Sequence, residues 1–157
     1  MKTNIGISEA NRKTVAEQLG KLLADEFVLY AKTLNAHWNI EGPDFHSVHV
    51  YFEELYGQSQ DIVDSVAERI RQIGHYAPAT LKDFIKLTHL TEQFKGANNS
   101  QDLIKNLLGD HESIIEFIRS NVKEFNDAHK DAGTSDFVTS LMEKHEKIAW
   151  MLRAHLK

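Results

Sequence analysis

The chain has 157 residues, a formal net charge of −5 and no cysteine, and 26% of its residues are charged. The negative charge argues against a general nucleic-acid-binding protein, whose footprint is normally basic, and the missing cysteines exclude disulfides and thiolate metal sites. No apolar run reaches the roughly 20 residues that a membrane span needs, and the first residues lack the apolar core of a signal peptide. We therefore expect a soluble, cytoplasmic protein with one domain over residues 1–157, of which residues 1–10 form a short flexible tail.

The first two helices are indicated by apolar residues at helical steps. From Val15 to Trp38 these residues recur every three or four positions, which predicts an amphipathic helix whose buried stripe includes Trp38. Pro43 suits the first turn of a second helix, whose apolar residues continue to Ile73. Gly74 then predicts the end of that helix.

The second half of the chain predicts a short helix followed by two long ones. Thr80 and Asp83 form a small capping signature ahead of a short apolar stretch. Ser100 is expected to cap a third long helix that Gly133 ends, and Thr134 or Ser135 is expected to cap a fourth. No segment alternates with a period of two, so the predicted fold class is all-α. We expect a ferritin-like four-helix bundle with a short extra helix in the connection between the second and third helices.

The chain contains nine histidines, and three of them follow the apolar stripes of the last two helices. His111, His145 and His155 lie at helical steps from neighbouring apolar residues, so we interpret them as residues at the edge of the core. His46 is interpreted as a surface residue or as one that supports a ligand.

Two polar pairs on the second helix carry the functional signal. His49 and Glu53, like Asp64 and Glu68, are four residues apart, so each pair projects from one face of the helix. The eleven residues from Glu53 to Asp64 return to within roughly 20° of the same face but span about 16 Å. One chain therefore cannot bring both pairs to the same metal ion, whose bonds are about 2 Å long.

An antiparallel second copy of this helix would bring the two pairs together. A two-fold axis near residues 58 and 59 would place His49 and Glu53 opposite the other copy's acidic pair, and the symmetry would make two such sites. Gly57 and Ser59 have small side chains that would permit close approach, which would compensate for the roughly 1 kcal/mol that a mid-helix glycine costs relative to alanine. His37, at the end of the first helix, could complete the site.

The ligand types in this arrangement limit the choice of metal. Carboxylates combined with imidazole suit Fe(II), Mn(II) or Zn(II). The chain contains no Glu-x-x-His pair, which argues against the di-iron centre that many bundles build within one chain. Taken singly, each of the two pairs is more often part of a solvated helix face, and only their shared register favours a metal site.

The stretches AHWNIEGPDFHSVHVYFEE and DIVDSVAERI carry a specific resemblance. With their spacing, H-W-x(10)-H-x(3)-[DE]-x(10)-D-x(3)-E, the chain resembles the Dps family, the mini-ferritins, over essentially its whole length. The resemblance implies that His37, His49 and Glu53 bind metal together with Asp64 and Glu68 of a two-fold mate. It also implies a dodecamer built from two-fold dimers, which oxidises Fe(II) with hydrogen peroxide or oxygen as a ferroxidase, stores ferric mineral and protects against oxidative stress. The family most often has Asp where this chain has Glu53.

Two further properties of the family have weaker counterparts in this chain. Asp127, Asp131 and Asp136 lie where family members line a pore for iron uptake with acidic residues, and they are also expected at a helix end and cap. DNA-binding members carry a lysine-rich tail, whereas this tail offers only Lys2 and two basic residues at positions 12 and 13, so we predict weak DNA binding at most. The alternatives left open are a DNA-compacting shell and a shell that binds zinc or manganese at the same site without oxidising iron.

Overall fold

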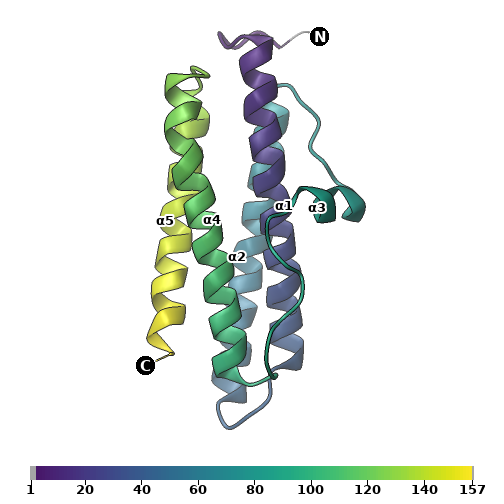
Figure 1. Ribbon diagram of the computed structural model, residues 1–157, viewed down its shortest axis with the longest axis vertical. Helices are drawn as coiled ribbons and strands as arrows, with labels where there is room; N and C mark the ends of the chain where they lie inside the picture. The colour runs from purple at the N-terminus through teal and green to yellow at the C-terminus, as the bar shows by residue number, and fades with distance from the viewer. Residues whose placement is uncertain (1–2, 157) are drawn as a thin grey trace.

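The structure is a computed structural model that describes residues 3–156, and its described residues form five α-helices and no strand (Figure 1). Helices α1 and α2 form one antiparallel hairpin, α4 and α5 form a second, and the short α3 lies outside the bundle beside α1 (Figure 1). The predicted all-α fold, with its extra helix in the long connection, is confirmed. The helices are α1 (Glu9–Asn39), α2 (Phe45–Gln72), α3 (Leu81–Leu87), α4 (Ser100–Asp127) and α5 (Ala132–Ala154).

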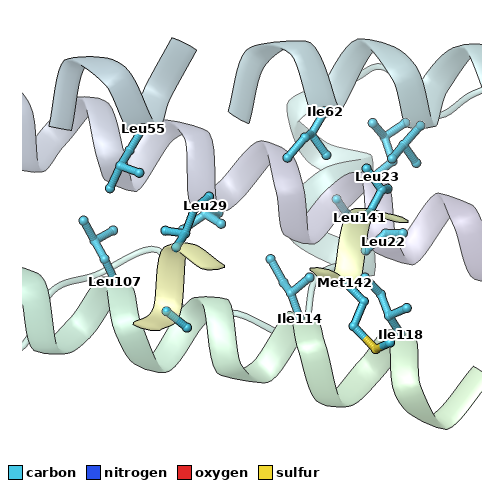
Figure 2. Close-up of a cluster of buried hydrophobic side chains, with 14 of the residues drawn as sticks. Leu22, Leu23, Leu29, Leu55, Ile62, Leu107, Ile114, Ile118, Leu141 and Met142 are labelled. Carbon is cyan, nitrogen blue, oxygen red and sulfur yellow. The ribbon is translucent and has the colours of Figure 1, made fainter. Parts of the chain in front are cut away.

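The core lies between the four long helices, each of which contributes aliphatic side chains to it. Figure 2 shows part of this cluster, in which leucine and isoleucine side chains from all four helices point toward one another. Fully burying one such side chain stabilises a protein by about 1.5–3 kcal/mol. Because each helix is amphipathic, this burial holds the two hairpins together. The cluster drawn includes Leu22, Leu29, Leu55, Ile62, Leu107, Ile114, Leu141 and Met142.

The end of α2 and the cap of α3 agree with the predictions, whereas Pro43 lies in the turn before α2, which begins at Phe45, and not in its first helical turn. Gly74 has a φ of 92°, and α2 ends just before it at Gln72. A Cβ added at Gly74 would also clash with the side chain of Thr3, so a larger residue here would require that side chain to move. Thr80 caps α3 as predicted, by accepting a hydrogen bond from the Asp83 backbone N–H.

Two predicted caps in the second half are wrong by a few residues. Asn99, not Ser100, caps α4, because its side chain accepts from the Asp102 backbone N–H. Asp131, rather than either later candidate, caps α5 by accepting from the backbone N–H of Thr134. Gly133 therefore lies in the first turn of α5 and does not end α4. The chain reverses before it, where Lys130 adopts a φ of 58°.

Burial on α1 differs from the predicted stripe. Trp38 is 68% exposed in this subunit, whereas the preceding His37 is only 8% exposed. Adjacent residues in a helix point about 100° apart, so both could not face the same core. The buried side of α1 also includes four charged residues, Arg12, Asp25, Glu26 and Lys32.

The three histidines interpreted as core-edge residues occupy different places. His111 and His145 are fully buried in the centre of the bundle, so that interpretation was wrong for both. His155 is exposed at the end of α5 and stacks on Tyr51, with ring centroids 5.2 Å apart.

The first residues pack on the start of the bundle. Helix α1 begins at Glu9, inside the range expected for the tail, and Ser8 caps it. Arg12 is buried and donates hydrogen bonds to the backbone carbonyls of Ile7 and Ile73. Residues 1–2 of the predicted tail lie outside the described residues, and the tail's flexibility stays a prediction. Within residues 3–156, none of the helices combines the length and the apolar character required to cross a membrane.

Candidate metal centre

His37 and His49 form a reciprocal pair where α1 turns into α2. His37 Nδ1 lies 2.9 Å from the backbone oxygen of His49, and His49 Nδ1 lies 2.8 Å from the backbone oxygen of His37. A carbonyl oxygen only accepts, so each ring must carry its proton on Nδ1. Each neutral ring then keeps a lone pair on Nε2, which is the form in which histidine binds a metal ion.

Aromatic neighbours limit the movement of these two rings. The rings of His37 and His49 stack with centroids 3.8 Å apart and an angle of 19° between them. Tyr56 meets His37 edge-on at 5.2 Å, and Phe45 stacks on His49 at 4.9 Å. Because hydrogen bonds and packing both fix the rings, their Nε2 atoms are oriented before any ligand arrives.

The three predicted carboxylates lie on the outer face of α2. Glu53, Asp64 and Glu68 are exposed, and none of them forms a hydrogen bond or ion pair with another residue of the described chain. Their oxygens are therefore available to a cation or to another subunit. Glu53 follows His49 by one helical turn and so lies on the same side of α2 as the histidine pair.

One subunit does not assemble the whole set. In the part of the chain that the structure describes, no three His, Asp or Glu side chains are close enough together to hold one metal ion. This agrees with the length of about 16 Å that separates the two halves along a helix. Of the predicted ligands, His37 and His49 are the two that the fold joins directly.

Gly57 and Ser59 do not share the role predicted for them. A Cβ at Gly57 would meet nothing within 4 Å, so this position is open on the face of the subunit. Ser59 is buried, and its hydroxyl donates to the backbone oxygen of Leu55 inside its own bundle. Two residues differ by about 200° around a helix, so the two side chains point to opposite sides. Only Gly57 is placed to permit close approach of a second helix.

Large apolar side chains are exposed at the ends of the helices that carry the pair and on α3. Trp38 is the side chain next to His37, and Phe45 and Val50 flank His49 along the chain. Leu81 and Ile85 of α3 are also more than half exposed. An apolar surface of this kind is typical of a protein interface.

The acidic residues considered for a pore divide into two kinds. Asp131 is buried, accepts from Arg69 at 2.9 Å and caps α5, so its carboxylate is used within the subunit. Asp127 and Asp136 are exposed and stay candidates. His46 is exposed on α2, as a surface residue would be.

The residues that orient the two histidines were not predicted from the sequence. Tyr56 lies seven residues after His49, which is two helical turns, so its place on the same face could have been noted. The reciprocal backbone hydrogen bonds leave no such signal, because they depend on how the turn brings the two helices together.

Comparisons with known proteins agree on the family. The model of the ferritin-like domain matches residues 16–157. A DNA protection during starvation protein of Helicobacter pylori is 39% identical over 142 residues, which cover 89% of this chain and 96% of that protein.

Solved structures of Dps proteins have the same fold. The Vibrio cholerae protein, described as a member of a broad superfamily of ferritin-like diiron-carboxylate proteins, aligns with a TM-score of 0.92 and 29% identity over 100% of this chain and 98% of its own. A Dps protein of Bacillus brevis aligns over the full length of both chains with a TM-score of 0.88 and 30% identity.

Proposed function

This chain belongs to the Dps family of ferritin-like proteins, and on that premise we propose that it oxidises Fe(II) and stores the ferric product. The oxidation takes place at sites shared between two copies of the chain, and the product is held inside a shell of twelve copies. The protein thereby removes the iron and peroxide that together generate hydroxyl radicals. It acts as a ferroxidase whose only catalytic groups are the metal ligands.

The observation that carries this proposal is the reciprocal histidine pair. Both rings are held with Nδ1 donating to a backbone carbonyl, so both Nε2 atoms are free to bind a metal ion. A pair that served only to join two helices would have no need to keep both lone pairs free. Glu53, one turn away on the same side, supplies the charged oxygen that such a site requires.

A second copy supplies the other half of the site. With its α2 antiparallel to the first, Asp64 and Glu68 of the partner face His37, His49 and Glu53, and Gly57 provides the space for the two helices to approach. The exposed apolar side chains next to the pair, Trp38, Phe45 and Val50, support an interface at this end of the α1–α2 hairpin. Two sites arise per dimer because the contact is symmetric.

The chemistry of the ligands fits iron as the substrate. Neutral imidazole and carboxylate oxygens both bind Fe(II), and the carboxylates stabilise the additional positive charge of the ferric product. Two Fe(II) ions each give one electron to hydrogen peroxide, which takes up two protons and becomes two molecules of water. Oxygen is the alternative oxidant, and zinc or manganese can occupy the same ligands without being oxidised.

DNA binding has little support from the described residues. Arg12, one of the few basic residues near the N-terminus, is buried and bonded to backbone carbonyls and to Glu9. Lys13 remains exposed, and Lys2 lies outside the described residues. Since DNA affinity rises with the number of phosphates neutralised, we propose weak binding at most.

The test is to load the protein with Fe(II) without oxygen, add hydrogen peroxide, and follow ferric absorbance and particle size together. Rapid oxidation with iron retained in a shell-sized particle is expected. Asp64→Ala should slow the initial rate by at least about tenfold, as loss of a metal ligand or its support does, while the particle stays assembled. Asp61→Ala, which removes an exposed carboxylate three residues earlier on α2, is the matched control.

Other outcomes would identify the alternative functions. Iron that stays ferrous in an intact shell would indicate a zinc- or manganese-binding protein. A salt-sensitive gel shift without oxidation would indicate a DNA-compacting shell. Normal oxidation by Asp64→Ala would show that the ligand set is wrong.

A further inference from the structure

A chain of three buried side chains crosses the centre of the bundle, away from the candidate metal centre. Glu26 of α1 lies 2.8 Å from Nε2 of His145 on α5, and Nδ1 of His145 lies 2.8 Å from Nδ1 of His111 on α4. All three residues are at most 1% exposed. This series of hydrogen-bonded side chains therefore links the α1–α2 hairpin to the α4–α5 hairpin through the core.

The contact between the two rings can form only when one of the two Nδ1 atoms carries a proton and the other does not. A hydrogen bond between two Nδ1 atoms needs one ring to donate and the other to present a lone pair. Whichever ring donates, the contact holds one proton. If both rings were imidazolium ions, two N–H groups would face each other at this distance, and the hydrogen bond could not exist.

The surrounding charges do not compensate for two imidazolium ions. On α1, Lys32 is paired with Asp110 of α4. Asp25, also on α1, accepts hydrogen bonds from Thr88 and His89 of the connection. The buried residues of α2 and the remaining buried residues of α5 carry no charge. Glu26, which bonds to His145, is thus the one carboxylate of the described core that contacts either ring, and it can balance a single positive charge.

We propose that the Glu26–His145–His111 chain is an acid-sensitive clasp between the two hairpins. It is closed while at least one of the two rings is neutral. A further proton from solvent opens it, because the Nδ1 contact is lost and two like charges are left in the core. Acidification then weakens the attachment of α1 to α4 and α5, independently of the metal centre.

The direction of the pH effect follows from the burial of His111. Burial, together with the neighbouring His145, lowers the pKa of His111 well below its ordinary value of 6.5. The unfolded chain therefore binds a proton at a higher pH than the folded one does. The stability that neutral His111 contributes is fully present above about pH 6.5 and is lost progressively as the pH falls below it.

The test compares urea unfolding of the whole protein between about pH 6.5 and pH 5.5, at one fixed protein concentration because assembly affects stability. His111→Gln keeps a group that can donate to His145 but removes one titrating ring. His46→Gln, at an exposed histidine of α2, is the control. Over this unit of pH, the unfolding constant of wild type and control should change by up to about tenfold more than that of His111→Gln. Equal pH dependence in all three proteins would overturn the proposal.

A second measurement requires no variant, in case His111→Gln does not fold. Exchange of the imidazole Cε1 hydrogen for deuterium, followed residue by residue by mass spectrometry, reports the protonation of each histidine in the wild-type shell. The clasp predicts that His111 stays neutral for as long as the shell is intact. Protonation of His111 and His145 together, with midpoints near pH 6.5 in an intact shell, would overturn the proposal.

Discussion

Two pairs of histidines lie in this subunit, and they use their ring nitrogens in opposite ways. His37 and His49, called the edge pair here, lie where α1 turns into α2. Each donates from Nδ1 to a backbone carbonyl and keeps Nε2 free. His111 and His145, the core pair, form a hydrogen bond between their Nδ1 atoms, and His145 also contacts Glu26 through Nε2. The partner of Nδ1 therefore decides whether a histidine is available as a ligand or is committed to the fold.

Burial separates the same two pairs. The carboxylates near the edge pair are exposed, and neither ring of this pair bonds to one of them, so removing a ring leaves no buried charge without a partner. The carboxylate that belongs to the core pair is fully buried, so removing its partner leaves it without a hydrogen bond. Unsatisfied buried polar groups each cost about 1–3 kcal/mol, and charged ones cost more. Mutations in the core pair should therefore lower the free energy of unfolding more than mutations in the edge pair do.

The largest effect is expected from His145→Leu, which leaves both Glu26 and His111 without the bonds they have now. The free energy of unfolding should fall by about 2–5 kcal/mol, as for two orphaned buried groups. His37→Leu, which removes a ring of the edge pair, should change it by less than about 1 kcal/mol. Chemical denaturation of both variants at pH 7.5 measures the difference.

Iron oxidation should respond in the reverse order. His37→Leu should lose at least about tenfold in initial rate, whereas His145→Leu, measured at a temperature where it stays folded, should keep a nearly normal rate per subunit. Comparable stability losses in the two variants would mean that the edge pair is also a structural element of the fold.

A second test of the difference between the two pairs is to place a large side chain at Gly57, the open position on the same helix as His49. Gly57→Leu should prevent the close approach of a second α2 and so abolish assembly and fast oxidation, although its own subunit has room for the side chain. Gly109→Leu is the matched control, because Gly109 lies in the interior of α4 and its Cβ would also meet nothing within 4 Å. Size-exclusion chromatography with light scattering would compare the two particles.

The outcome of the glycine comparison is specific to the proposed two-fold contact. Replacing a helical glycine by a better helix former should itself stabilise each subunit by up to about 1 kcal/mol. A loss of assembly in Gly57→Leu alone is therefore an effect of the interface. Normal assembly of Gly57→Leu would exclude a close contact between copies of α2 at this point.

The sequence predicted the bundle, which the structure confirms, and a division of the metal site between two subunits, which stays a prediction. Both predictions depend on periodicity along a single helix. The spacing of His49, Glu53 and Asp64 determines which side chains share a face, whatever the rest of the chain does. The caps at Asn99 and Asp131 were missed because neighbouring Ser and Thr residues have the same preference for capping positions. Which of these neighbouring residues caps the helix depends on the path of the turn before α4 or α5.

Periodicity cannot tell which surface covers a given face, and the remaining errors have this cause. Trp38 was expected in the core but is exposed in the subunit, and Ser59 was expected at an interface but faces its own core. His111 and His145 lie at the same helical steps as apolar residues, and their mutual hydrogen bond joins positions 34 residues apart. No local pattern indicates such a contact.

The smallest effect is expected at Glu53, the proposed ligand at a position where the resemblance to the Dps family implies Asp. Glu53→Asp keeps the charge and withdraws the carboxylate by one methylene, so the ligand set is preserved while one distance changes. Because Glu53 is exposed and has no bond to another described residue, unfolding should change by less than about 0.5 kcal/mol. The initial oxidation rate should change by less than about tenfold, below the loss expected when a ligand is removed. Titration of Fe(II) binding, measured together with the rate, would show whether a slower rate comes from weaker Fe(II) binding or from slower oxidation of bound Fe(II). A loss as large as that of Asp64→Ala would mean that the longer side chain of Glu53 is required to reach the metal from this position on α2.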